Sequence, residues 1–426
     1  MGRKVVIRDA VWGDVELDGV LTDVLGSREL QRQRGVRQLG TAHLVYPSAN
    51  HTRFEHQLGT CHVAGRILGA LAERGHACGP QEAAVIRAAA LVHDVGHVPF
   101  GHTFEDERRI FPRHDGPERM RWFLGSESEL GQRLAAHGLA DGVRAALLGE
   151  GPPSLARDVV GGTICADLLD YLARDARATG IRREYDERVF RYFSVREGRL
   201  VLCLSKRGLR RADAFSEVIH LLRLRYTLSE RVYFHHAKVA SGALISKLVE
   251  RACSLGLELR DLFPLGDDGL LDLLERDYAP QDPVVARLLA AYRRRQLPKR
   301  AYVLTRAVGP EQQAELVRRF HHDRGAREQV EAELERELGL EAGAVILYCP
   351  AADMALKEAD ILVELDGVHS LKTLGVREVD ALCEQHRDLW RFTVLLEGRH
   401  SEQAPRLAAA CAARFGHESE LEVGAQ

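Results

Sequence analysis

Apolar residues recur at the spacing of amphipathic helices through the first two thirds of the chain. Leu58, Val63 and Ile67 share one face of a helix that we expect to continue to about Glu73. The preceding pattern Thr52-Arg-Phe-Glu55 has the residues of a capping box, so it predicts where this helix begins. His56 then lies in the first turns of the helix.

The same spacing predicts further helices, and alternation of apolar with polar residues predicts strands. Helices are expected over residues 30–39 (short and basic), 81–91, from Pro117, within 126–160, and over 164–175, 211–251 (one or two), 312–338 and 377–389. Hairpins are expected over residues 4–20 and 190–204, and later strands over 301–305, 344–348, 360–364 and 391–396.

These elements predict a mainly α fold with a helical core, short β-hairpins and a small C-terminal α+β lobe. Because strand patterns replace helical ones beyond about residue 296, we expect one domain over residues 1–295 and the lobe over 296–426. The core of the first domain is expected over about residues 45–180.

Composition excludes several classes of protein. The 426 residues carry a net charge of −3, so no overall basic field indicates nucleic acid, and the basic stretch 292–300 is best explained as a solvated helix end. No apolar run reaches the roughly 18 residues of a membrane span. Residues 1–8 lack the apolar core of a signal peptide, and the eight cysteines form no C-x-x-C pair. We therefore expect a cytoplasmic protein with reduced thiols.

The stretch Leu91–His102 contains the most unusual chemistry of the chain. A buried helix ends at the adjacent His93 and Asp94, and Gly96 then permits a turn. Histidines at the negative end of a helix dipole would explain one imidazole but not the sequence His-Asp-x-Gly-His followed by a further histidine. Imidazole nitrogen together with carboxylate oxygen predicts a metal site.

His56, on one predicted helix, and Asp167, on another, carry the same types of ligand atom. One cavity between helices would bring them to His93 and Asp94. Two imidazoles and two carboxylates suit Mn, Mg, Fe, Ni or Zn, and the sequence does not choose among these divalent ions. The aspartates at 167 and 170 share one stripe of their helix, where they require water, partners or a metal.

The order His56, His93-Asp94, Asp167 resembles the HD superfamily of metal-dependent phosphohydrolases. Three longer stretches, 31–40, 46–59 and 93–102, together with 167–175, are similar to the deoxynucleoside triphosphate triphosphohydrolases, the group that includes the vertebrate sterile-alpha-motif/HD protein. The resemblance covers roughly residues 4–240. It implies hydrolysis of a dNTP to a deoxynucleoside and inorganic triphosphate, with water attacking the α-phosphorus.

The resemblance also implies a role for individual residues. The implied metal ligands are His56, His93, Asp94 and Asp167, and the implied proton-transfer residues are His97, His114 and Asp115. The implied contacts with phosphates, sugar and base are Gln38, Leu39, Arg53, His102, Tyr171, Asp175, Arg225 and Tyr233, with Arg174 an alternative to Asp175. The partners implied are dNTP substrates and further copies of this chain in a homo-oligomer.

The chain departs from the family pattern at three positions. Asp115 stands where the family usually has glutamate, and Leu168 stands where a phosphate-binding lysine often follows the last metal aspartate. Gly26 occupies the position of an acidic residue that reads an activator base, so guanine-nucleotide activation is not expected.

Two other functions stay open on the sequence. The chain would also suit another HD phosphohydrolase, acting on nucleoside monophosphates, cyclic dinucleotides or (p)ppGpp. The residues at 115 and 168 would also suit a catalytically weakened nucleotide-binding regulator.

Overall fold

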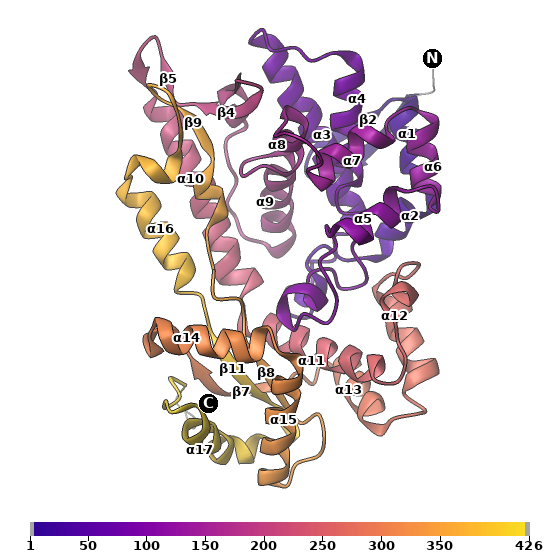
Figure 1. Cartoon of the computed structure of the whole chain (residues 1–426), viewed down its shortest axis with the longest axis vertical. Helices are drawn as coiled ribbons and strands as arrows, with labels where there is room; N and C mark the ends of the chain where they lie inside the picture. The colour runs from indigo at the N-terminus through magenta and orange to yellow at the C-terminus, as the bar shows by residue number, and fades with distance from the viewer. Residues whose placement is uncertain (1–3, 422–426) are drawn as a thin grey trace.

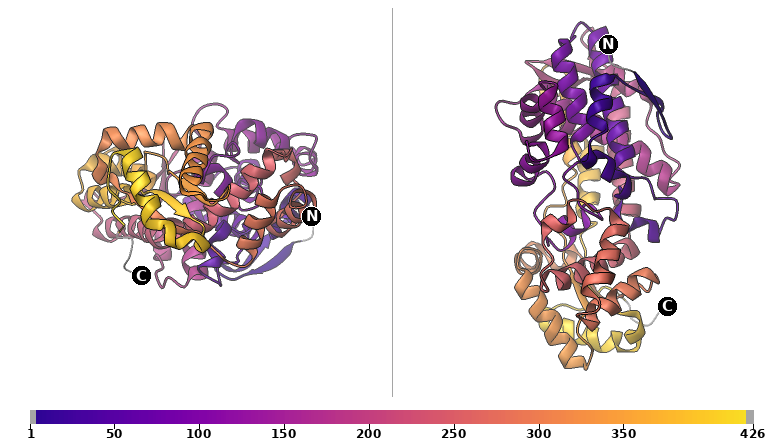
Figure 2. Two further views of the ribbon diagram at one scale, coloured as in Figure 1. Left: turned by 90° about the horizontal axis from the view of Figure 1, so that it is seen from below. Right: turned by 90° about the vertical axis from the view of Figure 1, so that its right-hand side faces the viewer.

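A computed structural model describes residues 4–421 of the chain. The molecule is elongated, with helices α3 (Arg53–Glu73) and α4 (Pro80–Val92) at one end and a small sheet with its helices at the other (Figures 1 and 2). The mainly α class predicted from the sequence is confirmed. None of the described helices is long and apolar enough to cross a membrane. Residues 1–3, part of the segment read for a signal peptide, lie outside the described residues.

The N-terminal hairpin is present as predicted, but the next helix is shorter than expected. Strands β1 (Val5–Asp9) and β2 (Gly13–Leu17) pair antiparallel. Helix α1 covers Gly19–Leu25, and α2 covers only Arg28–Arg32 before a 3-10 turn at Gln33–Gly35. The prediction of one helix over 30–39 is therefore wrong for its second half. Arg37 instead bridges to Thr52 in extended conformation.

Three helices form the centre of the helical part. Helix α3 packs against both α4 and α9 (Ala166–Thr179). The predicted capping box is confirmed, since the Thr52 hydroxyl accepts from the Glu55 amide and the Glu55 carboxylate accepts from the Thr52 amide. Gly59 permits the close approach of α9, because a Cβ there would collide with the carboxylate of Asp170.

Four shorter helices cover this centre, and two longer ones lead away from it. The covering helices are α5 (Pro117–Leu124), α6 (Glu129–Ala136), α7 (Ala140–Leu148) and α8 (Leu155–Gly161). The longer helices are α10 (Ala212–Leu228) and α11 (His236–Cys253), with a π-helical turn between them, followed by α12 (Asp267–Leu273) and α13 (Pro283–Arg293).

A four-stranded sheet joins distant parts of the chain. The predicted hairpin appears as β3 (Phe193–Arg196) and β4 (Arg199–Cys203). Strand β9 (Leu362–Glu364) pairs parallel with β4, and β10 (Val368–Ser370) completes the order β10-β9-β4-β3. The C-terminal third thus returns to the helical part, where α16 (Arg377–Arg387) also packs on α10 (Figure 1).

The remaining C-terminal elements surround a second apolar core that contains the fully buried Trp390. Its sheet has the order β7-β11-β8, all antiparallel. The predicted helix over 312–338 is interrupted, because a π-helical turn and a break at 322–323 separate its two halves. The elements are β7 (Lys299–Leu304), α14 (Pro310–Leu316), α15 (Arg324–Leu338), β8 (Val345–Tyr348), β11 (Phe392–Leu396) and α17 (Ala404–Phe415).

Candidate active site

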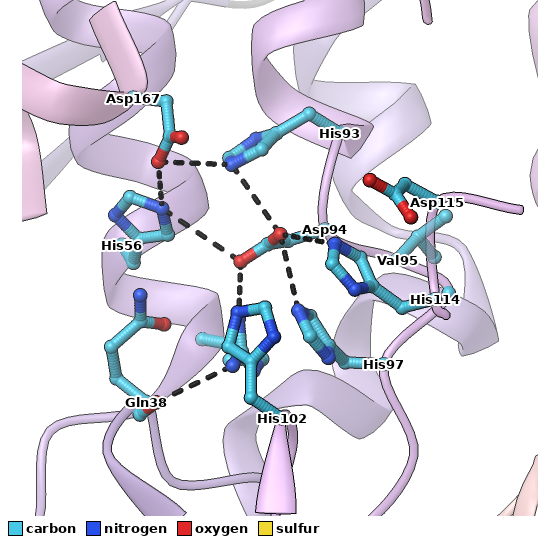
Figure 3. A network of polar contacts seen from close by, with 12 residues as sticks. Gln38, His56, His93, Asp94, Val95, His97, His102, His114, Asp115 and Asp167 are labelled. Atoms are coloured by element: carbon cyan, nitrogen blue, oxygen red, sulfur yellow. Dashed lines mark hydrogen bonds and ion pairs between the residues drawn. The ribbon is translucent and has the colours of Figure 1, made fainter. Parts of the chain in front are cut away.

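The four predicted metal ligands lie together although they come from three helices (Figure 3). His56 is in the first turns of α3, His93 caps the C-terminus of α4 with Asp94 directly after it, and Asp167 is in the first turn of α9. The Asp167 carboxylate lies 2.9 Å from Nε2 of His56 and 3.5 Å from Nε2 of His93. Asp94 lies 3.8 Å and 3.6 Å from the same two nitrogens.

The loop after α4 is held by one close backbone contact and by side-chain hydrogen bonds to its carbonyl groups. Gly96 lies against the carbonyl oxygen of His114, with which a Cβ would collide. The carbonyl of Val95 accepts hydrogen bonds from Arg32 (2.9 Å) and Gln33 (2.9 Å). Arg32 also donates to the carbonyl of His97 at 2.8 Å. The basic stretch near residue 32 therefore supports this loop instead of lying in solvent.

A buried carboxylate orients His56. Oδ2 of Asp170 lies 2.8 Å from Nδ1 of His56, and Arg174 donates to both oxygens of Asp170 at 2.8 and 2.9 Å. Trp12 donates to the same carboxylate at 2.5 Å. A carboxylate behind an imidazole fixes its ring and directs Nε2 into the cluster. Arg174, an alternative phosphate ligand on the sequence, is buried in this support and also pairs with Asp9.

The charges and the buried imidazole nitrogens of the cluster fit a divalent cation. Nε2 of His56 and Nε2 of His93 are buried and face the carboxylate of Asp167. Nδ1 of His93 lies 2.9 Å from the carbonyl of Ala90, which directs Nε2 toward the carboxylates. Burial opposes a charge on His56, yet Asp167 and Asp170 outweigh it and raise the pKa of His56 to about 10. A site that attracts a proton so strongly would also attract a metal ion.

A second group of imidazoles lies beside the cluster. His97 and His114 stack with ring centroids 3.5 Å apart, and their Nε2 atoms lie 3.4 and 3.6 Å from Oδ1 of Asp94. Nδ1 of His114 is held at 2.9 Å by Glu105, whose other oxygen accepts from Arg119 at 2.9 Å. Burial lowers the pKa of His114, while Glu105 works in the opposite direction. Burial and the charge of Arg53 hold the pKa of His97 well below its ordinary value.

The Asp115 side chain forms no hydrogen bond or ion pair with the ring of His114, and the structure describes both residues. Its carboxylate accepts from Arg113 at 2.9 and 3.0 Å, and half of its side chain is exposed (50%). It does not cap α5 either, because the N-cap residue is Gly116. The carboxylate that orients His114 is therefore Glu105, which the sequence analysis did not single out. Its position three residues after His102 and directly after the apolar Phe104 was the available signal.

Arg53 and His102 border the cluster on the side of a large cavity. The Arg53 guanidinium is fully buried, forms an ion pair with Asp94 and lies 3.4 Å from the carbonyl oxygen of Gln38. His102 is about half exposed (48%), and its ring lies 4.6 Å from that of His97. The guanidinium of Arg53 and the imidazole of His102 thus lie between the metal-ligand cluster and the cavity.

The cavity has a volume of about 590 Å³, within the range of small-ligand sites. It brings together seven of the eight residues predicted to contact substrate, and Arg53 lies just behind it. The predicted residues in its lining are Gln38, Leu39, His102, Tyr171, Asp175, Arg225 and Tyr233.

Two polar pairs shape the wall of this cavity. The hydroxyl of Tyr233 donates to Asp175 at 2.7 Å, and the other oxygen of Asp175 lies 2.8 Å from Nε2 of His51. Arg225 donates to Glu358 at 3.0 Å, and Tyr171 donates to the same oxygen at 3.3 Å. Glu358, from the C-terminal third, could not be found from local sequence because its partners are distant along the chain.

The loop that carries His97 and His102 is also held from α12. The amide of Phe100, a residue with φ of 62°, donates to Asp267 at 2.7 Å. Asp267 also accepts from the backbone and the guanidinium of Arg37, each at 3.1 Å. Because burial outweighs these bonds, the pKa of Asp267 is raised to about 6. One fully buried carboxylate therefore links the loop to the segment that presents Gln38.

Comparison with known proteins places the chain in a family. The family described as HD domain matches residues 53–175, and the family described as HD associated region matches residues 186–413, more than half of the chain. Among solved structures, a phosphohydrolase from Bacteroides thetaiotaomicron has a TM-score of 0.71 at 21% identity, covering 92% of this chain and 99% of that one. At 21% identity, this similarity shows that the two chains share a fold.

Curated relatives agree with the family match. The uncharacterized protein MJ1154 of Methanocaldococcus jannaschii is 31% identical over 63% of this chain and 54% of its own length. The uncharacterized protein YwfO of Bacillus subtilis is 29% identical over 60% and 57%. Deoxynucleoside triphosphate triphosphohydrolase SAMHD1 of Mus musculus is 28% identical over 54% and 41%. The chain spans about half the length of these relatives. The chain belongs to the HD-domain family and carries its HD-associated region.

Proposed function

We propose that the protein is a metal-dependent dNTP triphosphohydrolase, which converts a dNTP and water to a deoxynucleoside and inorganic triphosphate. The observation that carries this proposal is the position of the His56, His93, Asp94 and Asp167 cluster beside the 590 Å³ cavity. The name of the mouse relative supports the same reaction, at 28% identity over 54% of this chain.

The His56, His93, Asp94 and Asp167 side chains would hold a divalent cation, which would supply charge neutralisation and activation of water for attack on phosphorus. The chain's own contribution to proton transfer comes from His114. Its ring reaches the cluster through Nε2, while Glu105 holds Nδ1 and favours the imidazolium. His114 is thus placed to give a proton to the departing 5′ oxygen, and stacked His97 keeps its ring in place.

The cavity wall offers separate places for the parts of a nucleotide. Arg225 and Tyr171, near the cluster, supply a cation and a hydroxyl for phosphate oxygens. The Tyr233 and Asp175 pair supplies hydrogen-bonding groups suited to a sugar hydroxyl. Oε1 of Gln38 is buried without a hydrogen-bond partner among residues 4–421, so a bound sugar or base would satisfy it.

The test is incubation of metal-loaded protein with each dNTP and each NTP, followed by chromatography of the products. The proposal expects a deoxynucleoside and triphosphate from dNTPs. Orthophosphate or pyrophosphate as the product would instead assign another HD phosphohydrolase reaction, and metal-dependent binding without turnover would assign a nucleotide-binding regulator. A homo-oligomer in the cytoplasm belongs to this proposal through the resemblance, and light scattering with nucleotide and metal present tests the assembly.

A further inference from the structure

The turn that carries Glu105 also contacts the C-terminal sheet, through a buried arginine. This turn is the single π-helical turn η3 (Thr103–Glu107), and Arg108 directly follows it as its C-cap residue. The Glu105 carboxylate bonds to His114 and Arg119 within the HD domain. Three residues later, the Arg108 side chain bonds to helices α11 and α15 instead.

The Arg108 guanidinium is fully buried and donates to three elements of the HD-associated region. It bonds to Glu250 of α11 at 3.0 Å, and to Glu331 of α15 and the carbonyl oxygen of Leu347 in β8, each at 2.7 Å. Burial opposes a charge on Arg108, yet the two glutamates outweigh it and raise the pKa of the guanidinium above its ordinary value. One side chain of the HD domain thus joins two helices and a strand of the other region.

Further bonds hold the same turn to these helices. Arg327 of α15 donates to the backbone carbonyl of Arg108 at 2.9 Å. Glu107, the last residue of the turn, accepts from Lys238 of α11 at 2.6 Å. A Cβ at Gly242 of α11 would collide with the Glu107 carboxylate, so the turn lies directly on this helix. The turn is therefore held at its backbone as well as at two side chains.

We propose that Arg108 is a positioning residue, through which the HD-associated region holds the Glu105 carboxylate against His114. This inference rests on the proposed function and deepens it, because it names how the C-terminal part of the chain acts on the proton donor. Misplacing a catalytic group by about 1 Å can cost about 10²-fold in rate. Arg108 is not among the residues that line the 590 Å³ cavity, so its loss should lower kcat and leave KM nearly unchanged.

Kinetics of metal-loaded variants with a dNTP test the assignment. Arg108→Met should lower kcat about 10–100-fold at nearly constant KM and metal content. Arg108→Lys keeps the charge but not the planar fork that reaches both glutamates, so kcat should fall only about three- to tenfold. This second variant also serves if Arg108→Met does not fold. In a Glu105→Gln background, either substitution should lower kcat by less than about threefold more, because the carboxylate that Arg108 positions is gone.

A control and a readout without turnover separate positioning from stability. Leu334→Ala is the matched control, since Leu334 is buried in the same helix α15 and its apolar side chain forms no ion pair. It should weaken the fold and keep kcat within about twofold of the parent. In hydrogen exchange followed by mass spectrometry, the amides of residues 103–110 should exchange about tenfold faster in folded Arg108→Lys and at the parent rate in Leu334→Ala.

Three results would overturn the assignment, because each indicates a purely structural ion cluster. They are the parent kcat in both Arg108 variants, a loss that adds fully to that of Glu105→Gln, and an equal loss of kcat in Leu334→Ala. Faster exchange of residues 103–110 in a protein without dNTP turnover would refute the proposed function and keep the role of Arg108 in holding the turn. Turnover of dNTPs with no effect of Arg108 on kcat or exchange would do the reverse.

Discussion

The contact between Glu105 and His114 gives the sharpest prediction about catalysis. Glu105→Gln keeps the volume of the side chain but removes the charge that lies 2.9 Å from Nδ1 of His114. The imidazolium then loses its buried counter-charge, so the pKa of His114 falls and less of the acid form is present at neutral pH. We expect kcat at neutral pH to fall by up to about 10²–10⁴-fold, the whole contribution of a general acid.

The same structure predicts a small effect at the neighbouring carboxylate. Asp115→Asn removes a half-exposed ion pair with Arg113, which contributes at most about 1 kcal/mol to stability. Because the Asp115 side chain forms no hydrogen bond or ion pair with His114, kcat should stay within about twofold of the parent.

Glu105→Gln also leaves the buried Arg119 without its carboxylate, which should lower the free energy of unfolding by up to about 3–5 kcal/mol.

Steady-state kinetics with a dNTP across pH 5.5–9, at a temperature well below the Tm of each variant, separates these effects. Circular dichroism and metal content serve as controls for folding and for the metal centre. Glu105→Gln should move the alkaline limb of the kcat profile to lower pH. The assignment of Glu105 would be refuted if a folded, metal-loaded Glu105→Gln variant kept the parent kcat and pH profile. It would also be refuted if Asp115→Asn lost more kcat than Glu105→Gln.

Three further predictions concern the metal centre and its support. Asp94→Ala should leave a folded protein that retains less than about a tenth of the parent metal, by mass spectrometry of the eluted metal, because a ligand is removed from the shell; stoichiometric metal would contradict the ligand set. Asp170→Asn should weaken metal binding about 10–100-fold in a chelator competition, since His56 loses its orienting carboxylate; unchanged affinity would contradict this. The pKa of Asp267 is raised to about 6, so the fold favours its protonated carboxyl. The resulting stabilisation of the folded state is fully present below about pH 4 and is lost as pH rises through 6. Relative to Asp267→Asn, the parent should therefore lose up to about 3 kcal/mol of unfolding free energy between pH 4 and 7 in urea titrations, and a constant difference would contradict the raised pKa.

The helices that carry the candidate ligands could be predicted because their signals are local. The capping box at residues 52–55 placed the start of α3, and the apolar run before His93 placed the end of α4, each within a residue or two of the structure. The helix boundaries in turn place the ligands, because a residue's position in a helix fixes the side to which it points.

The errors arise where distant contacts decide the conformation. Residues 33–39 look helical by spacing, but Arg32 and Gln33 bond to the loop at Val95 and the chain then extends to bridge Thr52. Strand β9 pairs with β4, a partner about 160 residues earlier. No periodicity within a segment reports such a partner.

The same reason explains which site residues were overlooked. Glu105 meets His114 through a π-helical turn that no apolar pattern predicts, whereas Asp115 is adjacent in sequence and points elsewhere. Glu358 and Asp267 reach the cavity wall and the loop from separate parts of the chain. A buried carboxylate with a basic partner becomes recognisable only when the fold brings the two together.

Hydrolysis of a dNTP in ¹⁸O-labelled water by the metal-loaded protein tests the central claim most directly. Attack of water on the α-phosphorus breaks the bond between that phosphorus and the 5′ oxygen. Mass spectrometry should therefore find one ¹⁸O atom in the triphosphate and none in the deoxynucleoside, and Asp94→Ala should form neither product. Label in orthophosphate or pyrophosphate, or in the deoxynucleoside, would contradict a triphosphohydrolase reaction at this metal centre.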